Sequence, residues 1–529
     1  MWDVEVDLVS AGSSCGGLVG AITGHDHGLS TMVIEKSYCF GGGAALSGGV
    51  IWIPNNHHMA KKGLEDSRED ALTHLQHIGL GRHDEKRAIA FIDYGPEMLK
   101  YIEENTPLKM TILPRYPDYR SELPGGRFAG RYLLPSPLPM AMVLAEAEKK
   151  YPILDKVRKP PVSLQLGMPD ELWAGGRTLI GPLVLACIDR GIEIRLKTRA
   201  KKLIVENGRV IGLRAEHDGK DLLIKANKGV LLATGGFEWN LQMNKRFIEG
   251  DIHPFTNPQN EGDGHIMGME IGAAVALMDH TVRLPTIRIP GEEIDGKPLY
   301  RLFLASCGKP GDIIVNRQGK RCCNESFYLD MGRAFLERNT SSLAYTNRPI
   351  YWIADQSHRN KYFCGPLAPG KPADGCTWIQ KADSIQSLAE KLNLPSEQLE
   401  QTVEEFNRYA KEGKDPVFHR GETAYDRIAG DPNHSPNPSI GPLEKPPFYG
   451  IELFPGTAGN QGGLVTNRCA QVIGIRGEVI PGLYGTSNAT AHLAMGSGYN
   501  SGFFNGRSMV FGYVAAKHMA GYPELEQSE

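Results

Sequence analysis

The chain has 529 residues, more than one hydrophobic core usually supports, so we expect at least two domains. Its 58 Lys and Arg against 61 Asp and Glu give a formal net charge of -3, which argues against a nucleic-acid partner. Nine cysteines without CxxC pairs predict reduced thiols and a cytoplasmic location, and neither the cysteines nor the adjacent His57 and His58 have metal-ligand spacing, so no metal site is predicted. The sequence has no signal-peptide pattern and no apolar run of about 20 residues, so we expect no membrane span.

The N-terminal residues predict a dinucleotide-binding βαβ unit. A strand over residues 5–10 is followed by a glycine turn from Gly12 to Gly17, a helix from residue 18, and a second strand over residues 31–34 that ends at Glu35. Gly12 suits the tight turn, the amides at the helix N-terminus could hold a pyrophosphate, and Glu35 could accept hydrogen bonds from a ribose. Ser14 replaces the usual second glycine, so on local sequence alone the motif fits a phosphate loop and a structural turn about equally.

Further glycine clusters favour a cofactor site over a structural turn. Residues 41–49 directly follow the acidic strand end, and Gly235 and Gly236 close an apolar strand. Near the C-terminus, residues 482–498 are again rich in glycine and lead to a helical run from Met509, whose N-terminus could face a developing negative charge. Three separated clusters favour a long flavin cofactor over a nucleotide alone.

The pattern along the chain predicts an α/β fold in which a Rossmann-like FAD-binding domain carries an inserted α+β catalytic (cap) domain. Residues 192–236 read as strands, with a hairpin turn at residues 206–208. Residues 384–412 predict two amphipathic helices, and the Pro/Asn-rich run at 431–438 is typical of a linker. We therefore expect the FAD-binding domain at 1–278 and 438–529, and the inserted domain at 279–437.

Several longer stretches carry a family resemblance: residues 46–56, 95–99, 106–110, 116–126, 420–427 and 510–513. In these the chain resembles the flavin-dependent 3-ketosteroid 1-dehydrogenases, within the broader family that includes fumarate reductase flavoproteins. The resemblance implies FAD as cofactor, a steroid or other cyclic ketone as substrate, and an external electron acceptor. It also implies that the ketone is polarised, a tyrosinate removes a proton from the adjacent carbon, and the next carbon gives hydride to flavin N5.

The resemblance assigns roles to four residues. Tyr119 is expected to support the proton acceptor, while the Tyr499 hydroxyl and the Gly502 amide are expected to hydrogen-bond the ketone, in a loop shorter than the family's Tyr-Pro-Gly-Pro-Gly. The family's base follows the pattern Asn-Glu-Ser-x-x-Tyr, whereas residues 324–329 place Tyr328 one position early and a leucine in register. Either a local deletion restores Tyr328 as the base, or the base is another residue.

The predicted FAD site combines the glycine clusters with small and charged residues around them. It comprises Gly12, Ser14, Cys15, Gly16, Glu35, Lys36, Gly42, Gly43, Ala44, Ser47, Gly48, Gly49, Ala200, Gly235, Gly236, Asp263, Asn488 and Gly498.

Four alternatives remain open at this point. Residues 499–502 are also similar to the steroid 4-dehydrogenases, which leaves the position of the new double bond open. The bulky Phe503 and Phe504 fit a smaller ring ketone such as a cyclohexanone derivative. A fumarate-reductase-like ene reductase would use Arg507 to clamp a carboxylate, and a flavin-binding protein without catalytic activity would need no tyrosine set.

Overall fold

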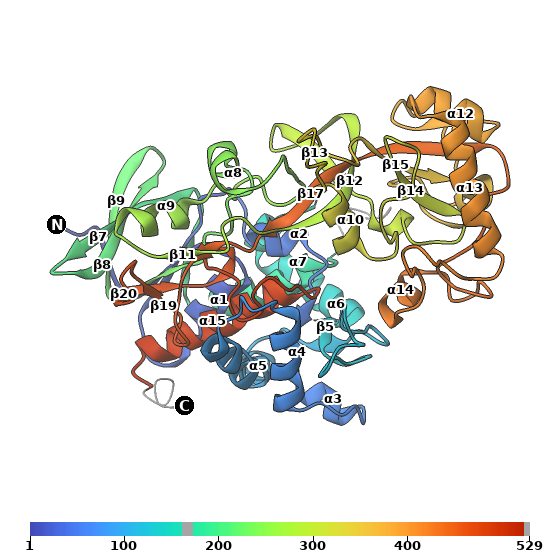
Figure 1. The fold of residues 1–529 in the computed structure, drawn as a ribbon. Coiled ribbons are helices and arrows are strands. Elements are labelled where there is room, and N and C mark those ends of the chain that lie inside the picture. The colour runs from blue at the N-terminus through green and yellow to red at the C-terminus, as the bar shows by residue number, and fades with distance from the viewer. Residues whose placement is uncertain (161–172, 523–529) are drawn as a thin grey trace.

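Two β-sheets organise the molecule, and the long strand β17 (Phe448–Asn460) belongs to the second of them (Figure 1). The structure is a computed structural model and describes residues 1–160 and 173–522. None of the helices within these ranges is long and apolar enough to cross a membrane.

The first sheet confirms the predicted βαβ unit. Strand β1 pairs in parallel with β2, and helix α1 (Cys15–Asp26) connects them. Strands β9, β20 and β6 extend this parallel core, while β7, β8 and β19 join in antiparallel fashion. The bounds are β1 Val4–Ala11, β2 Thr31–Ile34, β6 Glu193–Arg195, β7 Thr198–Glu206, β8 Arg209–His217, β9 Lys220–Leu232, β19 Gln471–Ile473 and β20 Val479–Gly485.

Each face of this sheet has its own apolar cover. Helices α1, α5 (Glu85–Asn105), α7 (Gly176–Asp189) and α15 (Phe503–Met519) contribute buried residues to one core together with Leu8 and Val33 of the sheet. Val9 and Met32 point the other way, into a second core built largely from β7, β8 and β9. Burial on both faces fits the adjacent apolar residues Leu8 and Val9 in β1 and the run over residues 32–34 in β2.

The turn between β7 and β8 has the geometry that the sequence predicted. Asn207 and Gly208 both have positive φ, 50° and 77°, as a two-residue type I′ hairpin turn requires. The hairpin at residues 206–208 is therefore confirmed.

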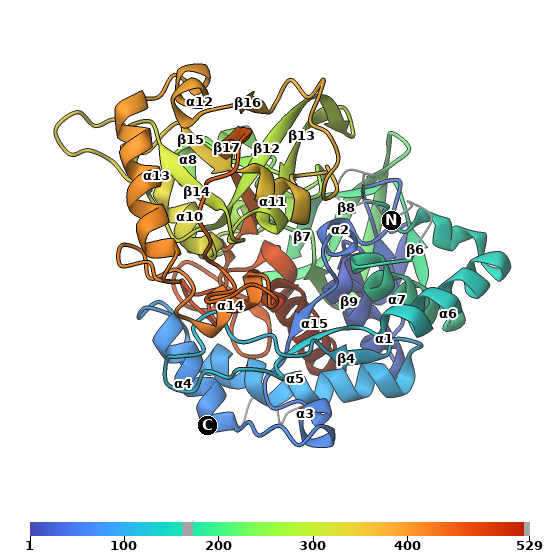
Figure 2. The same cartoon turned by 90° about the vertical axis from the view of Figure 1, so that its right-hand side faces the viewer.

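The second sheet is mostly antiparallel, and its central strands run in the order β13-β12-β17-β15-β14. Helices α12 (Ile385–Leu392) and α13 (Ser396–Ala410) cover one face with buried leucines and Phe406, which confirms the predicted pair of amphipathic helices. Figures 1 and 2 both show these helices at the outer end of the molecule, away from α1 and α15. The other strands of this sheet are β10 His253–Pro254, β12 Thr281–Ile294, β13 Lys297–Leu302, β14 Asp312–Asn316, β15 Ile350–Ala354 and β16 Gln380–Ala382.

The second sheet extends beyond the boundaries expected for the inserted domain. Strand β17 follows residue 438 yet pairs with β12 and β15, and β10 precedes residue 279 yet pairs with β17. After β17 the chain returns to the first sheet through β19 and β20, and α15 then packs against it. The insertion therefore shares its central strand with the C-terminal segment, because sheet pairing joins residues that are distant in sequence.

The remaining elements surround these sheets. The helices are α2 Gly42–Leu46, α3 His57–Lys61, α4 Arg68–Ile78, α6 Pro137–Lys150, α8 Leu241–Phe247, α9 Asp263–Glu270, α10 Tyr328–Ala334, α11 Gln356–Lys361 and α14 Ala424–Ala429, with 3₁₀ turns at Pro152–Lys156, Leu304–Ser306 and Ser487–Ala489. The short strands are β3 Ile51–Trp52, β4 Met110–Ile112, β5 Tyr132–Pro135, β11 Val275–Ala276 and β18 Gly463–Leu464.

Candidate active site

One cavity of about 740 Å³ brings together the glycine clusters and the tyrosines that the sequence singled out. Its walls come from the βαβ unit, from the loops after β9 and β20, and from the second sheet with α10 and α14. The predicted residues that line it are Gly12, Ser14, Cys15, Glu35, Lys36, Gly42, Gly43, Ala44, Ser47, Gly48, Ala200, Gly235, Asp263, Asn488, Tyr119, Tyr328, Tyr499 and Gly502.

The turn after β1 requires glycine at the first position of the motif but accepts serine at the second. Gly12 has φ of 116°, and a Cβ there would lie 2.2 Å from the carbonyl oxygen of Ala233, so this position needs glycine. Ser14 is the N-cap of α1 with φ of -69°, which any residue can adopt. Its Oγ lies 2.8 Å from Oγ of Ser487, so the serine side chain has a place beside the cavity.

Glu35 has a fixed position at the end of β2. Its Oε2 accepts hydrogen bonds from the Ser13 amide at 3.0 Å and the Ser13 hydroxyl at 2.6 Å, and its Oε1 accepts one from the Ser37 amide at 2.9 Å. A carboxylate offers about four acceptor positions, so capacity remains for a ribose hydroxyl. The neighbouring Lys36 is already engaged, because its ammonium donates to Glu261 and Asp263 at 3.1 and 2.9 Å.

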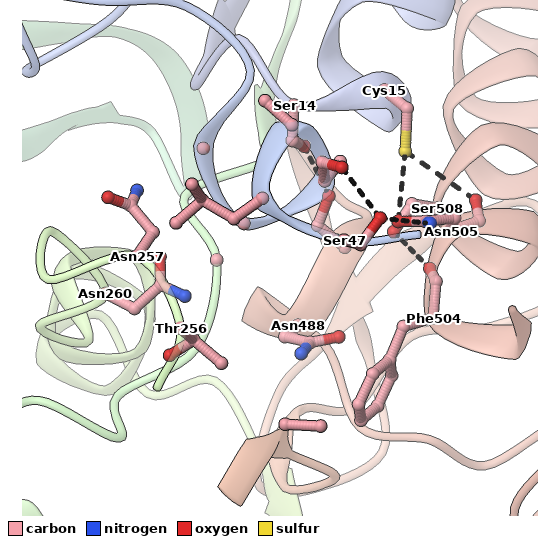
Figure 3. Close-up of a pocket in the computed structure, with 18 of the residues that line it drawn as sticks. Ser14, Cys15, Ser47, Thr256, Asn257, Asn260, Asn488, Phe504, Asn505 and Ser508 are labelled. Carbon is pink, nitrogen blue, oxygen red and sulfur yellow. Dashed lines mark hydrogen bonds between the residues drawn. The ribbon is translucent and has the colours of Figure 1, made fainter. Parts of the chain in front are cut away.

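The glycines of α2 and the loop after it leave open space that a cofactor can use. A Cβ on Gly42, Gly43 or Gly48 would find its nearest neighbour at 3.6 to 3.9 Å, so a side chain there would project into the cavity. Across the cavity from Ser14 and Cys15 lie the side chains of Asn257 and Asn260 (Figure 3). The bare backbone of α2 lies beside these amides, because a Cβ on Gly42 or Gly43 would be 3.6 Å from Nδ2 of Asn257 or 3.8 Å from Nδ2 of Asn260. Bare backbone and adjacent amide groups suit the phosphates and hydroxyls of FAD, so the residues present fit this cofactor.

Cys15 lies in this wall as a neutral thiol. Its Sγ is 3.7 Å from the carbonyl oxygen of Asn505, and burial raises the pKa of the thiol to about 12. Since the thiolate is the reactive form, Cys15 contributes volume and weak polarity here and no nucleophile.

Four predicted cofactor residues lie outside the lining of this cavity: Gly16, Gly49, Gly236 and Gly498. Each meets a neighbouring segment at close range. An added Cβ would lie 2.5 Å from the Ser508 carbonyl oxygen at Gly16, 2.7 Å from that of Gly175 at Gly49, 2.4 Å from the Glu238 carboxylate at Gly236, and 2.6 Å from the Ile78 carbonyl oxygen at Gly498. Gly16, Gly49 and Gly498 therefore permit close packing of backbone segments around the cavity, whereas the neighbour at Gly236 is the end of a flexible side chain.

Tyr328 and Tyr119 form a hydroxyl pair on the cavity wall. The Tyr328 hydroxyl donates to the Tyr119 hydroxyl at 2.6 Å, and the rings meet edge to face with centroids 5.4 Å apart. Helix α10 begins at Tyr328, which faces the cavity, whereas Leu329 does not line it. Despite the one-residue offset in the sequence pattern, Tyr328 and not Leu329 therefore faces the cavity.

Burial sets the protonation of these tyrosines. It raises the pKa of Tyr328 well above the usual value for a phenol, and the neighbouring Tyr499 adds to this, while the hydrogen bond with Tyr119 acts in the opposite direction. Burial likewise raises the pKa of Tyr119 and Tyr499. The hydroxyls are therefore neutral in the free protein.

Tyr499 and Gly502 occupy the loop that precedes α15. The Tyr499 ring lies 5.1 Å from that of Phe504 and 6.2 Å from that of Tyr119. Gly502 is the N-cap of α15 with φ of 79°, and its amide forms no hydrogen bond within residues 1–160 and 173–522. The helix begins at Phe503, six residues before the expected Met509, so its N-terminus opens at the cavity.

Sequence reasoning missed several residues that line the cavity. Tyr425 packs on Tyr119 with ring centroids 4.4 Å apart, and Tyr116 is another lining residue. Both fall in stretches that carried the family resemblance, which was the available signal. Asn257 and Asn260 carried no such signal, because their loop reaches the cavity through the tertiary fold alone.

Arg507, the clamp of the ene-reductase alternative, does not line this cavity. Its guanidinium is buried and donates to the carbonyl oxygens of residues 487, 490 and 491 and to the side chains of Thr490 and Asn488. Burial lowers its pKa to about 9. The arginine thus holds the backbone before α15 in place.

The end of the cavity near the tyrosines is apolar. Its walls there include Phe255, Leu284, Leu302, Leu304, Ala458 and Phe504. Among the described lining residues Lys36 is the only Lys, Arg or His, and it pairs with acidic residues in the βαβ region. Residues 161–172, which lie outside the described part, contain no Lys, Arg or His in their sequence.

Comparison with known proteins also indicates an FAD-binding chain. Residues 7–501 match the FAD binding domain family. The chain is 36% identical to a 3-oxosteroid 1-dehydrogenase of Mycobacterium tuberculosis, over 98% of both chains. It is also 34% identical to a 4-oxocyclohexanecarboxylate 2-dehydrogenase of Sinomonas cyclohexanicum, over 97% of this chain and 93% of the relative.

A solved structure of similar sequence has the same fold. The 3-ketosteroid delta1-dehydrogenase from Sterolibacterium denitrificans, in complex with 1,4-androstadiene-3,17-dione, superposes with a TM-score of 0.89 and 32% identity, covering 98% of this chain and 99% of that one. The predicted fold class, a Rossmann-like FAD-binding domain with a second α+β unit, is thereby confirmed.

Proposed function

This chain belongs to the FAD binding domain family and is an FAD-dependent oxidoreductase, and we propose that it desaturates a neutral 3-ketosteroid between carbons 1 and 2, next to the ketone. The observation that carries the proposal is the Tyr328–Tyr119 hydroxyl pair in the same cavity as the glycine loops of the βαβ unit. A base beside a flavin pocket is what removal of two hydrogens from adjacent carbons requires.

Tyr328 is the proposed base. As a phenolate it would take the proton from the carbon next to the ketone, and Tyr119, 2.6 Å away, would donate a hydrogen bond to that phenolate. Apolar walls exclude water, so this donor counts for more than it would in solution.

Tyr499 and Gly502 are the proposed ketone ligands. A hydroxyl and a free amide at the start of α15 would hold the carbonyl oxygen and stabilise the negative charge that grows on it as the proton leaves. The positive end of the helix dipole favours the same charge. This polarisation makes the neighbouring carbon acidic enough for a tyrosinate.

The proposed cofactor site is the part of the cavity around Gly12, Ser14, Glu35, Gly43 and Asn260. FAD held there would supply the acceptor for the hydride that leaves the second carbon. Because each turnover reduces the flavin, we also propose an external electron acceptor that reoxidises it.

The charge of the cavity supports a neutral substrate over a carboxylate. A ring acid of the kind named for the Sinomonas relative would need a cation beside its carboxylate, since a buried unpaired charge is costly. The apolar end offers leucines and phenylalanines, and Lys36 is already paired. A large apolar ring system with one ketone at the tyrosines therefore fits best.

Two other reactions remain as alternatives. Desaturation of the 4,5 bond needs the same ketone ligands with the base beside a different carbon, so the tyrosine set accommodates it. The ene-reductase alternative is less well supported, because Arg507 is committed to the backbone outside the cavity. We place the enzyme in the cytoplasm, a proposal supported by nine cysteines that are all free thiols.

Anaerobic flavin absorbance tests this function. A saturated 3-ketosteroid should bleach the flavin stoichiometrically, cyclohexanone should do so weakly, and 4-oxocyclohexanecarboxylate should not do so at the same concentration. Bleaching by the carboxylate alone would overturn the steroid assignment, and no bleaching by any cyclic ketone would leave a flavin protein of another function.

A further inference from the structure

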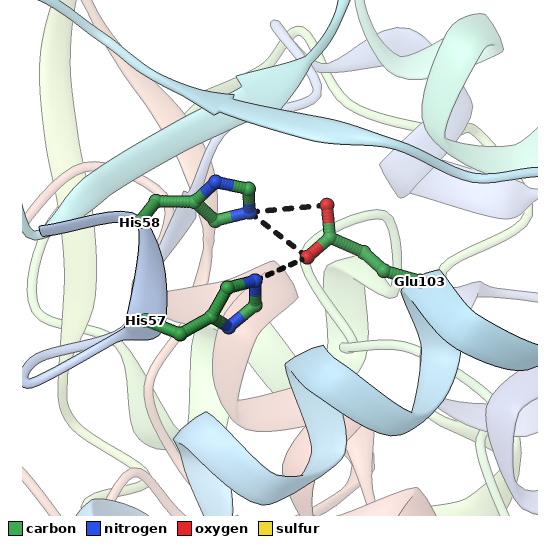
Figure 4. A group of neighbouring side chains, drawn as sticks. All are labelled: His57, His58 and Glu103. Carbon is green, nitrogen blue, oxygen red and sulfur yellow. Dashed lines mark hydrogen bonds and ion pairs between the residues drawn. The ribbon is translucent and has the colours of Figure 1, made fainter. Parts of the chain in front are cut away.

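Three side chains with metal-binding atoms converge on the side of the molecule formed by α3 and α5. His57 and His58 open α3, and Glu103 lies in the last turn of α5 (Figure 4). The Glu103 Oε2 is 2.9 Å from Nε2 of His57 and 2.8 Å from Nε2 of His58, and Oε1 is 3.1 Å from the latter nitrogen. The sequence predicted no metal ligands here, because Glu103 is 45 positions from His58 and only the fold joins them.

We propose that His57, His58 and Glu103 bind a divalent transition-metal ion of the zinc class. Two imidazoles and one carboxylate are ligands that zinc uses in proteins, with positions left for water. The histidine side chains are 28% and 19% exposed, so solvent can reach the site and complete the coordination.

The spacing of the three ligand groups suits one ion. Two atoms that are each about 2.1 Å from a metal lie about 3.0 Å apart at a right angle and about 3.4 Å apart at the tetrahedral angle. The nitrogen-to-oxygen separations of 2.8 to 3.1 Å lie at or slightly below the lower end of this range, so small outward side-chain movements would admit the ion.

Neighbouring contacts hold the ligands in place. The Glu103 Oε1 accepts a hydrogen bond from the Met110 amide at 2.8 Å, which fixes the carboxylate. The Asn56 side chain caps α3 by accepting from the His58 amide at 3.1 Å, which fixes the start of the helix. Lys109 donates to the main-chain carbonyl oxygen of Glu103, so its ammonium does not form an ion pair with the Glu103 carboxylate. Ligands oriented in this way lose less freedom on binding.

The charge of the cluster also calls for a cation. Within residues 1–160 and 173–522, Glu103 forms ion-pair contacts with His57 and His58 alone. The buried Nδ1 of His57 has no partner in the described part of the chain. Within the described residues the Glu103 carboxylate thus has no lysine or arginine partner, and a bound divalent ion would supply a balancing positive charge.

None of the three ligands lines the flavin cavity, so the site can be tested without disturbing the enzyme. Holoenzyme freed of metal with a chelator is dialysed against zinc chloride, and bound zinc is measured by elemental mass spectrometry. We expect one zinc per chain that is lost, or weakened at least tenfold, in Glu103→Gln. The glutamine keeps an acceptor for the Met110 amide. His77→Gln, an exposed histidine in the last turn of α4, is the matched control and should bind as the wild type does.

Thermal unfolding gives a second readout. Zinc should raise the melting temperature of the wild type and of His77→Gln, but not of Glu103→Gln or His58→Gln, because a ligand stabilises only the state that binds it. Flavin content should be equal in all four proteins. Equal zinc binding by wild type and both site variants, or no zinc bound by the wild type, would overturn the proposal. If Glu103→Gln fails to fold, His58→Gln alone decides the outcome.

Discussion

The side chain of Asn500 joins the two segments that carry the candidate catalytic tyrosines: its Oδ1 accepts a hydrogen bond from the Tyr119 amide at 3.1 Å. Asn500 is buried and lies between Tyr499 and Gly502 along the chain. The carbonyl oxygen of Gly502 also accepts from the Trp52 amide at 3.3 Å, so the loop is held on both sides. The loop lacks the prolines of the related Tyr-Pro-Gly-Pro-Gly sequence, and these hydrogen bonds attach it to the neighbouring segments at Tyr119 and Trp52.

Replacing Asn500 with alanine should therefore misplace the ketone ligands relative to the base. We expect turnover to fall about ten- to a hundredfold, because small errors in the placement of reacting groups are costly. Steady-state kinetics with a 3-ketosteroid checks this, with flavin content measured in parallel. Asn339→Ala, which removes a similar side-chain acceptor from an exposed loop, should keep normal turnover. Equal loss in both variants would contradict a specific role for Asn500.

Tyr499→Phe should reduce turnover about 10²–10³-fold, the usual cost of losing a donor to a developing oxyanion. The Tyr499 hydroxyl has no hydrogen-bond partner in the described chain, so its removal leaves no group unpaired and the melting temperature should stay within about 1 °C. Tyr132→Phe, at another buried hydroxyl without a partner and outside the cavity lining, is the control. Normal flavin reduction by Tyr499→Phe would remove this tyrosine from the mechanism.

The Tyr328–Tyr119 pair predicts a pH dependence. Burial raises the pKa of Tyr328, so the active phenolate gains population as pH rises and kcat/KM should increase towards alkaline pH. Tyr119→Phe removes the hydrogen bond that lowers this pKa, so the rise should move to higher pH and the rate at neutral pH should fall at least tenfold. Tyr328→Phe should show no turnover at any pH. A pH profile that is identical in wild type and Tyr119→Phe would contradict the pairing.

Glu35→Ala should weaken FAD binding by one to two decades, since a hydrogen bond to a charged group is worth about 1.5–3 kcal/mol. Glu35 also accepts from the Ser13 and Ser37 amides, so part of the loss would come from the turn itself. Glu35→Gln retains one acceptor for these amides and separates the two contributions. Titration of the deflavinated protein with FAD measures both variants, and unchanged affinity in Glu35→Ala would count against the placement of the ribose.

FAD should be bound without a covalent link. Cys15 is the only cysteine or histidine among the described residues that line the cavity, and its thiol is protonated because burial raises its pKa to about 12. Acid precipitation should therefore release the yellow colour into the supernatant. Flavin that remains in the pellet would contradict this.

Local patterns predicted those parts of the molecule that short-range physics determines. The βαβ unit, the turn at Asn207 and Gly208, and the amphipathic helices near Ser396 all follow from periodicity and backbone preference. The place of β17 in the second sheet does not follow from such local patterns, because its pairing with β12 and β15 depends on residues more than ninety positions away. The same limit explains Asn257 and Asn260, and Gly16, which packs against Ser508 and does not line the cavity.

Tyr328 illustrates the value of the structure most clearly. Sequence alignment by motif left it one position out of register, whereas the start of α10 presents it to the cavity and to Tyr119. Its role stays a prediction, and the variants above test it.

The position of the new double bond tests the central claim most directly. A saturated 3-ketosteroid is incubated with the enzyme and an artificial electron acceptor, and the product is examined by mass spectrometry and proton NMR. The account predicts the loss of two hydrogens and a pair of coupled vinyl protons at carbons 1 and 2, with no product from Tyr328→Phe. A product desaturated at carbons 4 and 5, or full activity of Tyr328→Phe, would contradict it.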